Sequence, residues 1–387
     1  MIPESAMSCR CVGGIGGVSP NGGVFALVNG LRDARDPRGR QYPLGTVLLV
    51  ALCALACRFD SFRAMGQWAA AAPPATLERL GLRRRGVFAV VKAPSAATIR
   101  RVVNAVMPGG LEGLLRVFQD KAELVAVDGK CLRGSRDTAG QAVMVLGAIL
   151  QDGTLVAQQR VADKSNEITG FAALLSVLEL EDAVVVADAL HTQRDHARVL
   201  VEEFGAHYAF PVKRNQPELW KACRTVPWER VRSSFRSTVR AHGRVDTRVV
   251  EVVSFAGLDF PYARQVARIT RYRTVKASGK RSRETVYVIT DLSSGQADPQ
   301  RIGELVRAEW GIENKIHYVR DVTFSEDASR IRTGHGAQNM ATLRSTAMNF
   351  LRTMGGSIAD ARRTLSLNPY TAPLDLFGIP CDLHVHA

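Results

Sequence analysis

The sequence has no apolar run long enough to cross a membrane. The longest run, residues 47–57, has 11 residues, whereas a membrane-spanning helix takes about 20. Residues 1–24 lack the basic start, apolar stretch and small-residue cleavage site of a secretory signal peptide. We therefore expect residues 1–24 to be a flexible leader on a cytoplasmic protein that has no membrane partner.

Cysteine is scarce and scattered. The seven cysteines are an odd number and do not form the regular framework of a disulfide-rich secreted domain. Cys9 and Cys11 are the closest pair, but no nearby His or Cys completes the spacing of a zinc site. We expect reduced thiols and no structural zinc.

Basic residues, in contrast, are abundant and unevenly distributed. The chain has 51 Lys and Arg against 37 Asp and Glu, a formal net charge of +14. Residues 1–110 carry +9, residues 111–220 carry −5, residues 221–285 carry +11 and residues 286–387 carry −1. This alternation indicates that the two basic blocks bind a polyanion and that the acidic or near-neutral blocks contain the catalytic groups. In the third block 13 of 16 basic residues are Arg, which suits phosphate contact, although a solvated Arg-rich sheet is the simpler alternative.

The 387 residues are enough for two or three domains. Residues 25–115 have the apolar spacing of helices, broken near Pro73 and Pro74, with Ser95 as a candidate cap of a later helix. This pattern is typical of a helical N-terminal DNA-binding or associated domain, and an ordinary helical bundle fits it almost as well.

From about residue 120 the pattern changes to strands alternating with helices, which predicts an α/β core with a mixed sheet. Residues 221–285 have short alternating stretches and are expected to be a basic, β-rich insertion into that core. The predicted divisions are a core of residues 120–220 and 286–355, the insertion of residues 221–285, and a C-terminal tail of residues 356–387.

Two acidic residues come directly after aliphatic strands. Asp128 and Asp188 each follow four or more mostly aliphatic residues. Ligands bind at strand ends in open sheets, so the two side chains converge if their strands are neighbours. The alternative is that each simply starts a turn, as Asp often does.

A third acidic position lies on the helix predicted to begin at Pro299. At about 100° per residue, Glu309, Glu313 and Arg320 fall within its apolar face. A charged group facing the core costs several kcal/mol unless it is paired or binds a metal. A Glu313–Arg320 ion pair is one explanation. The other is that Asp128, Asp188 and Glu313 form an oxygen-ligand set for Mg²⁺.

Nine short motifs in order resemble those of one family, the DDE transposases of insertion sequences, specifically the ISAs class and the related H-repeat-associated proteins. Together they extend over most of the chain. The motifs are residues 33–44, 94–101, 127–135, 163–167, 188–193, 212–217, 242–244, 310–314 and 317–327.

The resemblance implies an RNase H-like core in which Asp128, Asp188 and Glu313 are the catalytic, metal-binding triad. It implies two Mg²⁺ ions, which Mn²⁺ can replace, and a β-insertion that touches transposon-end DNA. Two positions depart from the family pattern, because a His is usual at Glu309 and an apolar residue at Arg320. Glu326 is a rival third acid.

Candidate DNA contacts lie next to these motifs. Some follow the predicted strands, others belong to the basic insertion, and the last stands beside the third acid. They are Lys130, Arg133, Lys213, Arg214, Asn215, Arg244, Arg248 and Arg320.

The expected function is therefore that of a bacterial insertion-sequence transposase. It would bind double-stranded DNA at transposon ends and at the target, act as a homodimer in the synaptic complex, and catalyse strand cleavage and strand transfer. Two alternatives remain open: an RNase H-like nuclease without strand transfer, and an inactive DNA-binding remnant or repressor.

Overall fold

The computed structural model describes residues 23–118, 121–161, 165–255 and 257–381. Nearly all of the predicted leader lies outside these ranges. Within them, every helix is too short or too polar to span a membrane.

The N-terminal part is helical, as predicted. It consists of α1 (Val24–Gly30), α2 (Leu44–Ala56), α3 (Phe62–Ala71), α4 (Pro74–Arg79) and α5 (Ala96–Ala105), with a small hairpin of β1 (Arg84–Arg85) and β2 (Val90–Val91). The Ser95 hydroxyl accepts a hydrogen bond from the Thr98 amide at 3.2 Å, so it caps α5 as expected. Every residue of α2 is buried, because the other helices surround it. The hairpin was not predicted.

The C-terminal residues fold onto this helical part and do not form a separate tail. α10 (Gly336–Thr353), α11 (Ile358–Leu367) and α12 (Ala372–Leu376) all contact α2. The Trp68 indole N–H donates to the Pro369 carbonyl at 3.2 Å, and the Thr76 hydroxyl donates to the Tyr370 carbonyl at 3.0 Å. The expectation of a tail over residues 356–387 is therefore wrong as far as residue 381. Residues 382–387 lie outside the described residues.

One nine-stranded mixed sheet runs through the rest of the molecule, in the order β5-β4-β3-β6-β7-β11-β10-β9-β8. Strands β3, β6 and β7 are parallel, and the remaining neighbours are antiparallel. The strands are β3 (Leu124–Leu132), β4 (Val143–Leu150), β5 (Leu155–Val161), β6 (Val184–Ala187), β7 (His207–Val212), β8 (Ser234–Ala241), β9 (Arg244–Ser254), β10 (Gln265–Val275) and β11 (Arg281–Thr290). Its helices include α6 (Ser165–Leu175), α7 (Arg194–Arg198), α8 (Pro217–Thr225) and α9 (Pro299–Ile312). This arrangement confirms the predicted α/β class with a mixed sheet.

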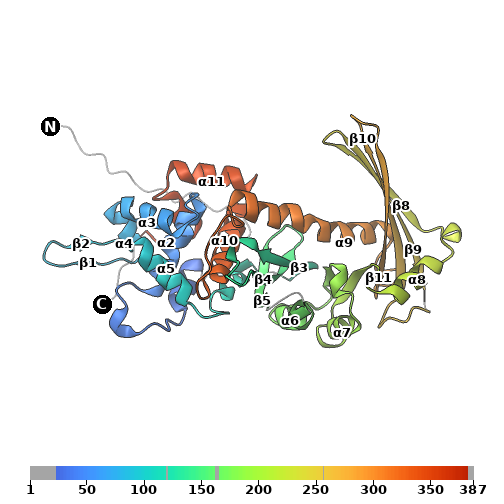
Figure 1. Cartoon of the computed structure of the whole chain (residues 1–387), viewed down its shortest axis with the longest axis horizontal. Helices are drawn as coiled ribbons and strands as arrows, with labels where there is room; N and C mark the ends of the chain where they lie inside the picture. The colour runs from blue at the N-terminus through green and yellow to red at the C-terminus, as the bar shows by residue number, and fades with distance from the viewer. Residues whose placement is uncertain (1–22, 119–120, 162–164, 256, 382–387) are drawn as a thin grey trace.

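The basic insertion continues the core sheet instead of forming a sheet of its own. Residues 287–290 of β11 pair with β7, and the whole of β11 pairs with β10. Strand β11 thus crosses the predicted boundary at residue 285. In Figure 1 strands β8–β11 stand at one end of the molecule, the helical N-terminal part lies at the other end, and β3 lies between them.

Helix α9 extends from strands β8–β11 toward the helical N-terminal part and lies across the sheet (Figure 1). The Asp298 carboxylate caps it by accepting a hydrogen bond from the Arg301 amide at 2.8 Å, and Pro299 occupies the first turn. The helix contacts β3, β6, β7 and β9. It then continues through two π-helical segments, Glu313–His317 and Val319–Thr323.

Candidate active site

Asp128 and Asp188 lie side by side in the sheet. Asp188 directly follows β6, as predicted, whereas Asp128 lies inside β3, which continues to Leu132, so the expectation that Asp128 ends its strand is wrong. Strands β3 and β6 are parallel neighbours, and their register pairs Val127 with Ala187, the residues immediately before the two acids. The Asp188 carboxylate accepts a hydrogen bond from the Leu190 amide at 2.9 Å and so begins the short turn that follows β6. Both predicted roles are therefore present together: Asp188 ends a strand beside Asp128, and it also starts a turn.

Helix α9 brings Glu309 close to these two acids. Burial raises the pKa of Glu309 to about 7; nearby Lys213 opposes that rise, while Asp128 and Asp188 add to it. The three carboxyl groups therefore interact electrostatically. Such a group of acids is unfavourable by itself, because like charges close together resist ionisation.

Glu313 follows one turn later and is connected to Asp128 through His317. The His317 Nδ1 lies 3.3 Å from Glu313 Oε2, and its Nε2 lies 3.6 Å from Asp128 Oδ2. Burial lowers the pKa of His317, and the charges of Lys130 and Arg320 lower it further. The Glu313 side chain is 79% exposed, so it points toward the solvent-facing side of the site.

The chemistry of these donors fits a hard cation such as Mg²⁺, which prefers carboxylate oxygen and keeps several water ligands. A cation there would offset the mutual repulsion of Asp128, Asp188 and Glu309. However, no three His, Cys, Asp or Glu side chains within the described part of the chain are grouped closely enough to hold one ion. The carboxylates lie near one another without forming a complete ligand shell.

Glu326, the rival third acid, is occupied by two buried ion pairs. Its Oε2 lies 2.8 Å from the Arg320 Nε, and its Oε1 lies 3.3 Å from the Arg344 Nη1. Burial alone would raise the pKa of Glu326, but the two guanidinium groups lower it below its ordinary value. Arg320 therefore pairs with Glu326, and the predicted alternative of a Glu313–Arg320 pair is wrong.

Lys130, a predicted DNA contact, is also buried and paired. Its ammonium group lies 2.7 Å and 2.8 Å from the two carboxylate oxygens of Asp321. Asp321 belongs to the second π-helical segment after α9. This ion pair therefore ties β3 to the chain just after Glu313 and His317.

Other predicted DNA contacts are exposed near the acidic site. Lys213, Arg214 and Asn215 directly follow β7 and are all exposed. The Asn215 amide donates to the Ala189 carbonyl at 2.7 Å, which joins the loops after β6 and β7. Arg133 is also exposed, with its Nη1 3.7 Å from Asp327 Oδ2.

The insertion presents arginines next to α9. Arg244 is exposed at the start of β9, whereas the guanidinium of Arg248 stacks 5.6 Å from the centre of the Trp310 ring. Arg248, Arg307 and Trp310 line a cavity of about 220 Å³. Burial lowers the pKa of Arg248, and the neighbouring Arg307 lowers it further. Positive charge is thus concentrated where the insertion meets the helix that carries the acids.

Glu309 was predicted on the apolar face of this helix without a role, and His317 was included only in the motif of residues 317–327. A usable signal existed, because Glu309, Glu313 and His317 are spaced four residues apart and therefore share one side of a helix.

Two family models match the chain. Residues 119–350 match the family described as "Transposase DDE domain", and residues 25–118 match the one described as "DDE_Tnp_1-associated". "Putative transposase YncI" of Escherichia coli O157:H7 is 28% identical over 369 residues, which cover 89% of this chain and 92% of that protein. "H repeat-associated putative transposase YhhI" of Escherichia coli K12 is 28% identical over 278 residues, 67% of this chain and 73% of that protein.

The chain belongs to the family of DDE-domain transposases. It is a transposase-type enzyme whose substrate is DNA. The resemblance seen in the sequence and the RNase H-like fold class are both confirmed.

Proposed function

We propose that this protein binds the ends of a bacterial insertion sequence and catalyses Mg²⁺-dependent strand cleavage followed by strand transfer. The observation that carries the proposal is the parallel register of β3 and β6, which places Asp128 and Asp188 side by side beneath α9. A pair of neighbouring carboxylates, in a basic protein, suits the displacement chemistry of phosphodiesters.

Asp128, Asp188 and Glu313 are the residues that would hold the metal ions. Bound there, two Mg²⁺ ions would supply charge stabilisation for the attacking and leaving oxygens of the phosphodiester. His317 lies between Glu313 and Asp128 and orients both. Glu309 is the alternative third acid, supported by its electrostatic coupling to both aspartates.

The cations divide into two groups with different proposed roles. Arg133, Lys213, Arg214 and Arg244 are exposed and are assigned to phosphate contacts, which make affinity salt-dependent. Arg248, beside Trp310, and Asn215, on the loop after β7, are assigned to DNA contacts as well. Lys130 is paired with Asp321 and Arg320 with the buried Glu326, and these pairs position the chain around Glu313 and His317.

The divisions proposed for the chain are an associated helical domain of residues 25–115, a core of residues 120–220 and 286–355, and a β-rich insertion of residues 221–285 that touches end DNA. Synapsis of two transposon ends requires two active sites, so we propose a homodimer in the synaptic complex. The enzyme is proposed to act in the bacterial cytoplasm, on DNA of the nucleoid.

The test compares strand cleavage by wild type with cleavage by Asp128→Asn, Asp188→Asn, Glu313→Gln and Glu309→Gln. The substrate is a duplex that carries the inverted repeat bounding this coding sequence, with Mg²⁺ or Mn²⁺ supplied. The two aspartate variants and one glutamate variant should lose cleavage by at least about 100-fold, a typical loss for a group that stabilises developing charge, while still binding the duplex.

Asp195→Asn is the matched control, because Asp195 is an exposed acid whose ion pair is with Arg198 on its own helix. Cleavage retained by Asp128→Asn or Asp188→Asn would contradict the proposal. The pair Glu309→Gln and Glu313→Gln identifies the third acid. Joined target products separate a transposase from a nuclease that only cuts.

A further inference from the structure

The β1–β2 hairpin projects from the helical N-terminal part and carries two apolar side chains at its tip. Val87 is 97% exposed and Phe88 is 89% exposed. A single exposed apolar residue is ordinary on a protein surface. Two adjacent ones, almost fully exposed at the tip of a hairpin, indicate a contact surface.

The base of this hairpin is firmly held. Arg84 pairs with Val91 and Arg85 with Val90 in the two-residue strands, and the Arg85 guanidinium donates to the Gln41 carbonyl at 2.7 Å. The Arg84 side chain also forms an ion pair with Glu78 of α4. The tip is therefore presented on a fixed support.

The tip turn is tight and is closed by its own backbone. The Ala89 amide donates to the Gly86 carbonyl at 3.1 Å. Both residues adopt positive φ, 72° for Gly86 and 47° for Ala89. Gly86 adopts this conformation at no steric cost, whereas Ala89 does so under strain. Strained backbone of this kind is often retained at functional positions.

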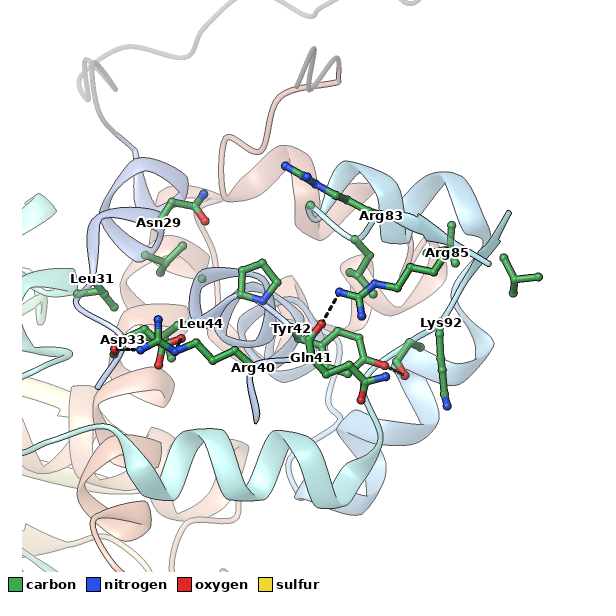
Figure 2. A pocket seen from close by; sticks show the side chains of 18 of the residues that line it. Asn29, Leu31, Asp33, Arg40, Gln41, Tyr42, Leu44, Arg83, Arg85 and Lys92 are labelled. Atoms are coloured by element: carbon green, nitrogen blue, oxygen red, sulfur yellow. Dashed lines mark hydrogen bonds and ion pairs between the residues drawn. The ribbon is translucent and has the colours of Figure 1, made fainter. Parts of the chain in front are cut away.

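The surroundings of the tip are strongly basic. No acidic residue occurs between Glu78 and Glu112, a stretch that contains seven Lys or Arg. Figure 2 shows the side chains of Arg40, Arg83, Arg85 and Lys92 around a cavity of about 1070 Å³ beneath the hairpin. Among the described residues, Arg83 and Lys92 have no ion-pair partner.

Apolar side chains on a basic support are the combination by which proteins insert a wedge between base pairs of the minor groove. Cations on the support contact the phosphates on either side. We propose that the β1–β2 hairpin inserts Phe88, with Val87 beside it, between two base pairs of duplex DNA.

The DNA that reaches this hairpin is the donor DNA flanking the transposon end. Strand β3 lies between the hairpin and strands β8–β11 along the long axis of the molecule (Figure 1). It contains Asp128, and its register with β6 puts Asp188 next to that residue. If β8–β11 hold the transposon end, as the proposed function states, an uncut duplex that passes the acids continues toward the hairpin. That continuation is flanking DNA, so the contact must be independent of sequence. The inference rests on the proposed function in this respect.

Two duplexes test the proposal. The first carries the inverted repeat bounding this coding sequence together with several helical turns of flanking DNA, and the second ends at the repeat. Binding is measured without divalent cations so that neither strand is cut. Phe88→Ala should bind the flanked duplex about tenfold more weakly than wild type, in the range of one lost aromatic–base stack, and should bind the second duplex as wild type does.

Matched variants show whether the loss of binding results from removing the large apolar side chain at the hairpin tip. Phe88→Trp keeps a large ring at the tip and should restore binding to the flanked duplex. Leu367→Ala removes an equally exposed apolar side chain, 87% exposed, from α11, and should leave both duplexes unaffected. A Phe88→Ala variant that bound both duplexes like wild type, or both equally weakly, would overturn the proposal.

Unstacking is observed directly with 2-aminopurine placed at successive positions of the flank. Wild type should raise its fluorescence at one step and Phe88→Ala should not. A change in self-association of Phe88→Ala, measured by sedimentation without DNA, would assign the tip to a protein contact instead. Failure of wild type to bind either duplex would contradict the proposed function itself, which is a result distinct from failure of the wedge.

Discussion

Glu326 and Glu309 are acidic residues in neighbouring parts of the same fold, and their environments are opposite. Glu326 is fully enclosed, with Arg320 and Arg344 each within 3.3 Å of its carboxylate. Burial disfavours the ionisation of Glu309; nearby Lys213 opposes that effect, and Asp128 and Asp188 add to it. The pKa of Glu326 is lowered as a result, whereas that of Glu309 is raised to about 7.

This difference separates a structural acid from an acid of the site. The protein itself neutralises Glu326, and the resulting pairs join the chain after α9 to α10. At the other site Glu309 lies close to two further carboxyl groups, Asp128 and Asp188, and Lys213 is the cation that acts on it. A divalent cation bound beside these carboxylates is the partner that the proposed chemistry requires.

The largest expected effect comes from removing the charge of Glu326, the structural acid. Glu326→Gln leaves two buried guanidinium groups without their anion, so the free energy of unfolding should fall by about 3–5 kcal/mol. Urea denaturation monitored by circular dichroism measures it. Glu304→Gln, a change at an exposed position of α9, is the control and should change stability little. If Glu326→Gln lost no more stability than the control, Glu326 would not be a structural acid.

A smaller effect is expected at Glu309, and it depends on pH. The folded pKa of about 7 exceeds the ordinary value of 4.5, so between these pH values the folded state binds more protons than the unfolded state. Stability should therefore fall as pH rises from about 4.5 to 7, by at most about 3 kcal/mol. In Glu309→Gln this loss should be absent.

The measurement is denaturation of metal-free wild type and Glu309→Gln at several pH values across that window. Glu304→Gln should keep the wild-type pH profile, since its side chain is exposed on the same helix. Parallel profiles for wild type and Glu309→Gln would show that Glu309 does not carry the effect.

Adding Mg²⁺ should stabilise the acidic site and leave the structural pairs unchanged. At an Mg²⁺ concentration 100 times the dissociation constant, the gain for wild type is about 2.7 kcal/mol. It is observed as a higher thermal midpoint. Asp188→Asn should lose most of this gain, and Asp195→Asn should retain it. An equal gain in both variants would place the cation elsewhere.

The smallest effect is expected from single exposed cations. Arg214→Ala should weaken DNA binding by severalfold and reduce the slope of log affinity against log salt concentration by about 1, because one phosphate contact is removed. Arg363→Ala, an exposed arginine on α11, should not change the slope. Fluorescence anisotropy at several salt concentrations provides the comparison.

Much of the fold was predictable because the signals are local. The strand before Asp128, the strand before Asp188 and the Asp298–Pro299 start of α9 are all encoded by adjacent residues. Pairing between distant segments was not predictable in this way. The joining of β11 to β7 depends on residues about 80 positions apart, and the packing of α11 on α2 depends on residues about 300 positions apart. Residues 286–355 were predicted to belong to the core, but the pairing of β11 with β7 and the packing of α11 on α2 were not predicted.

The candidate site shows the same limit. The proximity of Asp128 and Asp188 was predictable from the aliphatic segments before them, although β3 continues past Asp128 to Leu132. The relative depths of Glu309 and Glu313 were not predictable. A constant angle of about 100° per residue treats the two glutamates alike. The chain changes to a π-helical segment at Glu313, which alters the angle per residue and is often found at functional sites. The sequence carries no simple signal for that change.

The continuous sheet also fixes the distance between Asp128 on β3 and the outermost strand, β8. Six strand-to-strand steps separate β3 from β8, and at about 4.8 Å per step they span roughly 29 Å. That length corresponds to about eight or nine base pairs of duplex at ~3.4 Å each. Every step is a hydrogen-bonded ladder and not a flexible linker. If β8–β11 hold DNA as proposed, the bound segment would therefore have a fixed offset from the acids. The position of the cut relative to the gripped sequence would then be set by the number of strands.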